Sequence, residues 1–144
     1  MKPNKAAMLL PVLLLLGFVT AAASTGIDDK KSHSETDIQR ITVDELKAML
    51  ARNENVVIID VRGKDYDTSP TRIKGAIRIA PAEIASRLDS IPRDKEIVTY
   101  CACSTDGGAV NAARVLLDNG FKRVRALKGG WTEWVQSGGA VEPK

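Results

Sequence analysis

Short segments rich in apolar and β-branched residues recur along this chain, and helix-like segments separate them. A continuous apolar run is typical of a strand that is covered on both faces, as in a parallel sheet. Val56–Ile59 is such a run, and three further strands are predicted at Ile77–Ile79, Ile97–Tyr100 and Val124–Leu127. Strands that alternate with helices predict an α/β fold with a mostly parallel central sheet flanked by helices.

The predicted helices carry their own start and stop signals. Thr42 and Glu45 have the spacing of a capping box, so a helix is predicted to begin there. A second helix is predicted over 107–119, ended by Gly120. Shorter helices are predicted in the segment that begins at Pro81 and over 131–136. The apolar faces predicted for the two longer helices comprise Val43, Leu46, Met49, Leu50, Ala109, Ala112, Ala113 and Leu116.

The first 23 residues have the parts of a secretory signal peptide. Lys2 and Lys5 give a basic start, 6–19 is apolar, and three alanines precede a predicted cut before Ser24. The apolar run is shorter than the roughly 18–20 residues that a membrane span needs, so no stable anchor is expected after cleavage. The chain is therefore predicted to be exported, to the periplasm in a bacterium and otherwise secreted. An uncleaved anchor is the alternative.

Residues 24–40 are polar, charged and aperiodic, which predicts a flexible leader before one folded domain over 41–143. His33, the only histidine, lies in this leader and is predicted to be solvated, without a catalytic role. Of the 21 basic residues two fall in the signal peptide, which leaves 19 against 18 acidic residues. A nearly neutral chain without a basic stripe argues against nucleic acid as a partner.

Both cysteines, Cys101 and Cys103, stand where the third predicted strand gives way to the helix over 107–119. In a parallel sheet, ligands bind beyond the carboxyl ends of the strands. The N-terminus of a helix attracts anions and favours a thiolate, so a cysteine there needs no histidine to become nucleophilic. A disulfide between the two cysteines would close a small, strained and reactive ring. The alternative for Cys101 is a buried, inert side chain.

Four segments resemble the signatures of a single-domain rhodanese, in the order and spacing of that family. They are VVIIDVR (56–62), RIKGAIRI (72–79), EIVTYC (96–101) and VRALKGGWTEW (124–134). The resemblance implies a three-layer rhodanese-like fold and a sulfurtransferase. Such an enzyme takes the outer sulfur of a donor such as thiosulfate onto a cysteine as a persulfide and passes it to a thiol acceptor, which can be a protein thiol. No cofactor and no metal are implied.

The resemblance also implies which residues bind the sulfur-containing donor. The backbone amides of the loop over 101–106 would curl around the catalytic cysteine and hold both the anion and the persulfide. Counting from the strand gives Cys101 as the nucleophile, whereas counting back from the helix gives Cys103; we favour Cys101 because a strand end fixes its residue more tightly. The predicted donor-binding residues are Ala102, Ser104, Thr105, Asp106, Gly107 and Arg72.

Two departures from the family pattern bear on activity. The loop has no lysine or arginine and contains Asp106, either facing the donor or as an ordinary helix-start carboxylate, so turnover of free thiosulfate is predicted to be weak. Arg72 replaces the histidine that usually stands there, and it either lends positive charge to the site or packs at the surface. Asp60 and Arg62 are predicted to form a buried pair that holds the fold, with a catalytic role as the alternative. Trp131 and Trp134 are predicted to belong to the core; the alternative is contact with the substrate, in which Trp131 would rim the pocket.

Other functions remain open. Cys103 could resolve a persulfide or sulfenate on Cys101, which would make the protein a thiol redox module. The pair could instead bind a soft metal such as Cu(I), or a protein partner, without catalysis. A related phosphatase or arsenate reductase would need an arginine six residues after its cysteine, where this chain has Gly107 or Ala109.

Overall fold

A computed structural model describes residues 32–102 and 105–144 of the chain. The helices are α1 (Val43–Ala51), α2 (Asp65–Thr68), α3 (Gly107–Asp118) and α4 (Gly130–Gln136), with 3-10 turns η1 (Glu35–Asp37), η2 (Pro81–Ser86) and η3 (Leu88–Ser90). The strands are β1 (Arg40–Ile41), β2 (Val56–Asp60), β3 (Thr71–Ile73), β4 (Ile77–Arg78), β5 (Glu96–Tyr100), β6 (Val124–Leu127) and β7 (Val141–Pro143). The predicted signal peptide, Cys103 and Ser104 lie outside the described residues.

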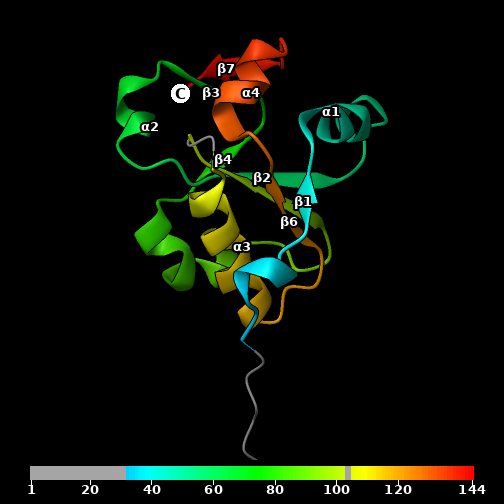
Figure 1. Ribbon diagram of the computed structural model, residues 1–144, viewed down its shortest axis with the longest axis vertical. Helices are drawn as coiled ribbons and strands as arrows, with labels where there is room; N and C mark the ends of the chain where they lie inside the picture. The colour runs from blue at the N-terminus through cyan, green and yellow to red at the C-terminus, as the bar shows by residue number, and fades with distance from the viewer. Residues whose placement is uncertain (1–31, 103–104) are drawn as a thin grey trace, which may run out of the picture.

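Five strands form the central sheet in the order β1-β6-β5-β2-β4, and every neighbouring pair in it is parallel. The continuous apolar run in β2 pairs with the one in β5, for example Ile58 with Val98. A small second sheet joins β3 to β7 in antiparallel fashion. Helix α3 lies on one side of the central sheet, and α1 and α4 lie on the other (Figure 1). The predicted α/β fold with a mostly parallel, helix-flanked sheet is therefore confirmed.

Helix α1 begins, and helix α3 ends, where their sequence signals predict. The Thr42 hydroxyl accepts a hydrogen bond from the Glu45 amide, and the Glu45 carboxylate accepts one from the Thr42 amide, so the capping box at α1 is present. Helix α3 is followed by Gly120 in the left-handed conformation with φ +87°, which a glycine adopts without strain. The helix predicted after Pro81 is instead two 3-10 turns, which bury Ile84.

The sheet separates two apolar cores. We name them the α3-side core and the α1/α4-side core. The buried members of the α3-side core are Ile38, Ile59, Val61, Ile79, Ile84, Ile91, Ile97, Cys101, Ala109, Val110, Ala112, Ala113, Leu116, Phe121, Val124 and Ala126. The buried members of the α1/α4-side core are Ile41, Val43, Leu46, Met49, Ile58, Ile73, Ala76, Val98, Tyr100, Leu127 and Trp134. Burying each large aliphatic side chain stabilises the fold by about 1.5–3 kcal/mol.

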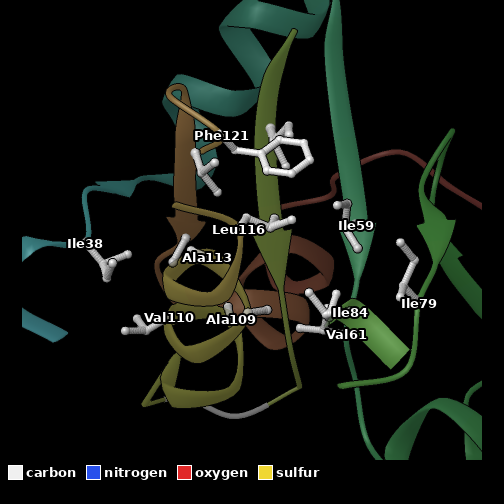
Figure 2. Close-up of a cluster of buried hydrophobic side chains, with 14 of the residues drawn as sticks. Ile38, Ile59, Val61, Ile79, Ile84, Ala109, Val110, Ala113, Leu116 and Phe121 are labelled. Atoms are coloured by element: carbon white, nitrogen blue, oxygen red, sulfur yellow. The ribbon is translucent and has the colours of Figure 1, made fainter. Parts of the chain in front are cut away.

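The α3-side core positions the cysteine loop. Figure 2 shows Ala109, Val110, Ala113 and Leu116 of α3 turned into this core, in which Ile59 and other aliphatic side chains of the sheet and η2 also lie. Alanines at this interface let the helix approach the sheet closely, and the first turn of α3 is thereby held beside the end of β5. The apolar face predicted for α3 is confirmed.

The end of the predicted leader is part of the domain. Residues 24–31 lie outside the described residues, and 32–40 include η1 and the start of β1. Ile38 is only 3% exposed and packs in the α3-side core. His33 donates its backbone N–H to the Asp118 carboxylate at the end of α3, and its ring contacts the same oxygen. This polar segment is ordered by one buried side chain and by contacts with a distant helix.

Candidate functional site

Cys101 is the first residue after β5, at the carboxyl edge of the parallel sheet. It is 3% exposed, and its carbonyl accepts a hydrogen bond of 2.8 Å from the Trp131 amide at the start of α4. The Thr132 hydroxyl donates to the carbonyl of Ala102 at 3.2 Å. The backbone of the loop is therefore held at its first two residues by the strand before it and by α4.

Two glycines open α3, and only the second lies against the cysteine. A Cβ added to Gly108 would lie 3.2 Å from the Cβ and 3.5 Å from the Sγ of Cys101. A Cβ added to Gly107 would meet nothing closer than the Thr105 hydroxyl, at 4.0 Å. The absence of a side chain at 108 thus lets the N-terminal turn of α3 pack directly on the thiol, where the helix dipole favours negative charge.

Asp106 closes the loop at the position before α3. Its backbone is left-handed, with φ 53° and ψ 4°, and among the described residues its side chain makes no capping hydrogen bond to α3. The carboxylate instead accepts a hydrogen bond of 2.9 Å from Nε of Arg40 in β1, and the residue is only 7% exposed. Its negative charge is therefore compensated from the edge strand of the sheet.

A buried polar network lies at the same sheet edge. The Arg62 guanidinium donates to both carboxylate oxygens of Asp60, with Nη2 at 2.6 Å, and the Tyr100 hydroxyl donates to Asp60 at 2.6 Å. Asp60 and Arg62 are fully buried. Burial raises the pKa of Tyr100, and its hydrogen bond to Asp60 adds to the effect. Asp60 and Arg62 thus form the buried pair that their sequence predicts.

Trp131 links this network to the cysteine. Its ring stacks on Tyr100 with centroids 6.3 Å apart, and the Arg62 guanidinium lies 4.3 Å from the Trp131 ring centroid. Its amide is the group that bonds the carbonyl of Cys101. Nη1 of Arg62 has no hydrogen-bond partner among the described residues, and the guanidinium carbon lies 5.6 Å from the Tyr100 ring centroid. Trp134 is 1% exposed and belongs to the α1/α4-side core, as predicted.

The described members of the predicted site fall into two places. Cys101, Ala102, Thr105, Asp106 and Gly107 lie together at the sheet edge. Cys103 and Ser104 lie outside the described residues. Arg72 is in β3, where its Nε donates to Glu142 of β7 at 2.9 Å. The Arg72 side chain thus forms an ion pair across the small sheet. This contact corresponds to the predicted structural role, packing at the surface, and not to the lending of charge to the site.

Arg40 is the residue that sequence reasoning missed. It lies 66 positions before Asp106 in a segment that reads as a leader, and no motif marks it. The pairing of β1 with β6 brings it to the loop, because Arg40 stands opposite Ala126 on the edge strand. Only the packing of the described residues reveals this contact.

Two further properties concern the described residues alone. None of their helices has the length and apolarity to cross a membrane. Across 32–102 and 105–144, no three His, Cys, Asp or Glu side chains cluster in a way that could hold a metal ion.

Comparison with known proteins gives one consistent family. The model of the rhodanese-like domain family matches residues 42–137. A protein named sulfurtransferase from Allochromatium vinosum is 28% identical, covering 70% of this chain and 92% of that protein. The thiosulfate sulfurtransferase GlpE of Glaesserella parasuis is 30% identical, covering 61% of this chain and 79% of that protein. The solution structure of a rhodanese-like domain from Anabaena has a TM-score of 0.63 at 27% identity, covering 73% and 79% of the two chains.

Proposed function

This chain belongs to the rhodanese-like domain family, and on that premise we propose that it is a sulfurtransferase whose sulfur-carrying residue is Cys101. The observation that carries the proposal is the direct packing of Gly108, in the first turn of α3, on the Cys101 side chain. Relatives named as sulfurtransferases, one of them for thiosulfate, support the same class of reaction.

The reaction has two half-reactions that share one covalent intermediate. The Cys101 thiolate attacks the outer sulfur of a donor such as thiosulfate, the sulfur–sulfur bond of the donor breaks, and sulfite leaves with the electron pair. An acceptor thiolate then attacks the outer sulfur of the Cys101 persulfide. The bond between the two sulfurs of that persulfide breaks, the outer sulfur forms a new persulfide on the acceptor, and the Cys101 thiolate is restored. The scheme predicts ping-pong kinetics.

The first turn of α3 would stabilise the negative charge that these steps place on sulfur. Unpaired N–H groups at a helix N-terminus carry partial positive charge, and they lower the free energy of a thiolate, a persulfide anion or a bound dianion. Glycine at 108 lets that turn come within contact distance of Cys101. No histidine is needed for this activation.

Activity on free thiosulfate is expected to be weak. The loop has no lysine or arginine, and a lost charge-assisted hydrogen bond to an anion costs about 1.5–3 kcal/mol. Asp106 contributes less to this expectation than its sequence position suggests, because Arg40 compensates its charge. A persulfide donor, or a donor delivered by a protein partner, would depend less on a basic loop.

Export of the mature protein and the role of Cys103 remain predictions. The composition of 1–23 supports secretion, and N-terminal sequencing of the protein recovered from the periplasm would test the cut before Ser24. Cys103 is proposed to attack the persulfide on Cys101, which would release sulfide and form an easily reduced disulfide.

Intact mass after exposure to a persulfide donor tests the proposal. The wild-type protein should gain one sulfur atom, and Cys101→Ser should gain none. Cys103→Ser should retain the added sulfur for longer than the wild type, because its resolving thiol is absent. Uptake by Cys101→Ser together with none by Cys103→Ser would reverse the two roles, and unchanged uptake in both variants would exclude this mechanism.

A further inference from the structure

We propose that Arg40 is a positioning residue for the sulfur site: by pairing with Asp106 it holds that carboxylate away from the first turn of α3. The amides of that turn then remain available to stabilise negative charge on the sulfur of Cys101. The proposal rests on the function proposed above and adds to it a residue outside the cysteine loop.

Asp106 stands at a capping position but does not cap the helix. An aspartate just before a helix ordinarily accepts hydrogen bonds from the amides of the first turn. Asp106 makes no such side-chain bond among the described residues, and its left-handed backbone departs from the extended conformation that a capping residue adopts. Its carboxylate turns to Arg40 instead, with Oδ2 at 2.9 Å from Nε.

Arg40 is itself held in place by the segment before β1. Its Nη1 donates to the Ile38 carbonyl at 3.3 Å, and its Nη2 lies 4.0 Å from the carboxylate of Glu35. Ile38 is buried in the α3-side core, so the guanidinium is fixed by a backbone group that cannot move freely. The side chain of Arg40 is 35% exposed and that of Asp106 is 10% exposed. The pair therefore lies at the boundary of the domain, with the carboxylate as the buried partner.

Loss of Arg40 would leave Asp106 without its cation. A nearly buried carboxylate without a paired cation is unfavourable unless other groups donate hydrogen bonds to it. The nearest unpaired donors at such a position are the amides of a helix N-terminus. Asp106 would then compete with the Cys101 thiolate and with an anionic donor for those amides. Arg40 thus supplies from a strand the positive charge that the loop itself lacks.

The pH profile of thiol alkylation reports this competition without requiring sulfur transfer. Cys103→Ser serves as the reference protein, so that the neutral probe iodoacetamide reports Cys101 alone. Arg40→Gln should move the midpoint of the profile to higher pH by about one unit and raise the KM for thiosulfate about tenfold, with a smaller change in kcat. Arg40→Lys should lie between the two, because it keeps the charge without the Nε contact.

Asp106→Asn separates positioning from mere structural support. Asparagine tolerates the left-handed backbone and carries no charge. In the Arg40→Gln background it should return the alkylation midpoint and the KM toward the reference values, even though two residues are now changed. The buried Asp60–Arg62 ion pair behind Trp131 is unchanged in every variant.

Arg125→Gln is the matched control. Its Nε donates to Glu96 at 2.6 Å, and Arg125 also contacts Met49 of the α1/α4-side core. It should lower the melting temperature without moving the alkylation midpoint. Equal midpoint shifts for Arg125→Gln and Arg40→Gln, or no recovery in the Arg40→Gln Asp106→Asn variant, would overturn the proposal. If the midpoint shifts as expected but no variant takes up sulfur, Arg40 positions the thiol and the sulfurtransferase function fails.

Discussion

Two neighbouring residues at the end of β5 face opposite sides of the sheet and have opposite characters. Tyr100 belongs to the α1/α4-side core and is bound to a fully buried ion pair, whereas Cys101 belongs to the α3-side core among aliphatic side chains. The alternation of side chains along a strand produces this division. One side fixes the strand end with polar contacts, and the other presents a thiol to a helix N-terminus. The thiol proposed to carry sulfur is thus held by contacts that the proposed reaction does not use.

The largest effect should come from the Tyr100 side. Arg62→Ala removes the hydrogen-bonded cation of the buried Asp60 carboxylate and leaves only Arg78, at 4.0 Å. This is expected to lower the free energy of unfolding by about 3–5 kcal/mol. Tyr100→Phe removes one hydrogen bond to the same carboxylate and should cost about 1–2 kcal/mol. Urea unfolding monitored by tryptophan fluorescence measures both. A smaller loss for Arg62→Ala than for Tyr100→Phe would show that the ion pair does not hold the strand end.

The Cys101 side should respond in reactivity rather than in stability. Gly108→Ala places a methyl group 3.2 Å from the Cβ of Cys101, so the thiol or the helix must move by a few tenths of an ångström. We expect the rate of Cys101 alkylation and of sulfur uptake, measured in the Cys103→Ser background, to fall about tenfold.

Gly107→Ala is the matched control for that change. Its Cβ would meet no atom closer than 4.0 Å, and alanine is a better helix former than glycine. It should leave alkylation within about twofold of the reference. If both variants lose alkylation rate equally, the start of α3 requires glycine for its backbone conformation. The contact between residue 108 and Cys101 would then not explain the loss.

The smallest effect concerns a charge contact that ties the N-terminal segment to the end of α3. The backbone N–H of His33 donates to Asp118 and, with the His33 ring contact, holds the pKa of that carboxyl below its ordinary value of 3.8. A carboxyl with a lower pKa in the folded state stabilises the fold above its unfolded pKa, and this contribution is lost as the pH falls through the folded value.

Asp118→Asn should therefore lower the free energy of unfolding at pH 7 by less than about 1 kcal/mol. The difference from wild type should disappear in acid, below the lowered folded pKa. Urea midpoints measured at both pH values test this, with the exposed Asp89→Asn as a control that should show no difference at either. A deficit that persists unchanged in acid would point to packing and not to charge.

Most of the fold follows from local sequence signals. The apolar runs of β2, β5 and β6 and the capping box at Thr42 determine their elements within a few residues, so the alternation of strands and helices could be anticipated. The two-residue strand β1 and the small β3–β7 sheet could not, because neither has an apolar period of its own. Their strands exist through pairing with distant segments.

The site divides in the same way. Cys101 and its place before a helix follow from order along the chain, as does the buried Asp60–Arg62 pair from its position after an apolar strand. The partner of Asp106 does not, since a charge in a polar segment gives no signal of which carboxylate it will meet. The ion pair of Arg72 could not be predicted either. Arg72 lies in a recognisable motif, but its partner, Glu142, is far along the chain.

Arg40 lies just outside the span, 42–137, that matches the family, whereas Asp106 lies within it. The electrostatic character of the loop is thus determined partly by a residue beyond the shared domain limits. The cysteine loop without β1 would carry an aspartate without its counter-ion. A chain shortened to the common limits would suffer the same loss while keeping the loop sequence intact. The segment that keeps the Arg40–Asp106 pair intact is longer than the span that matches the family model.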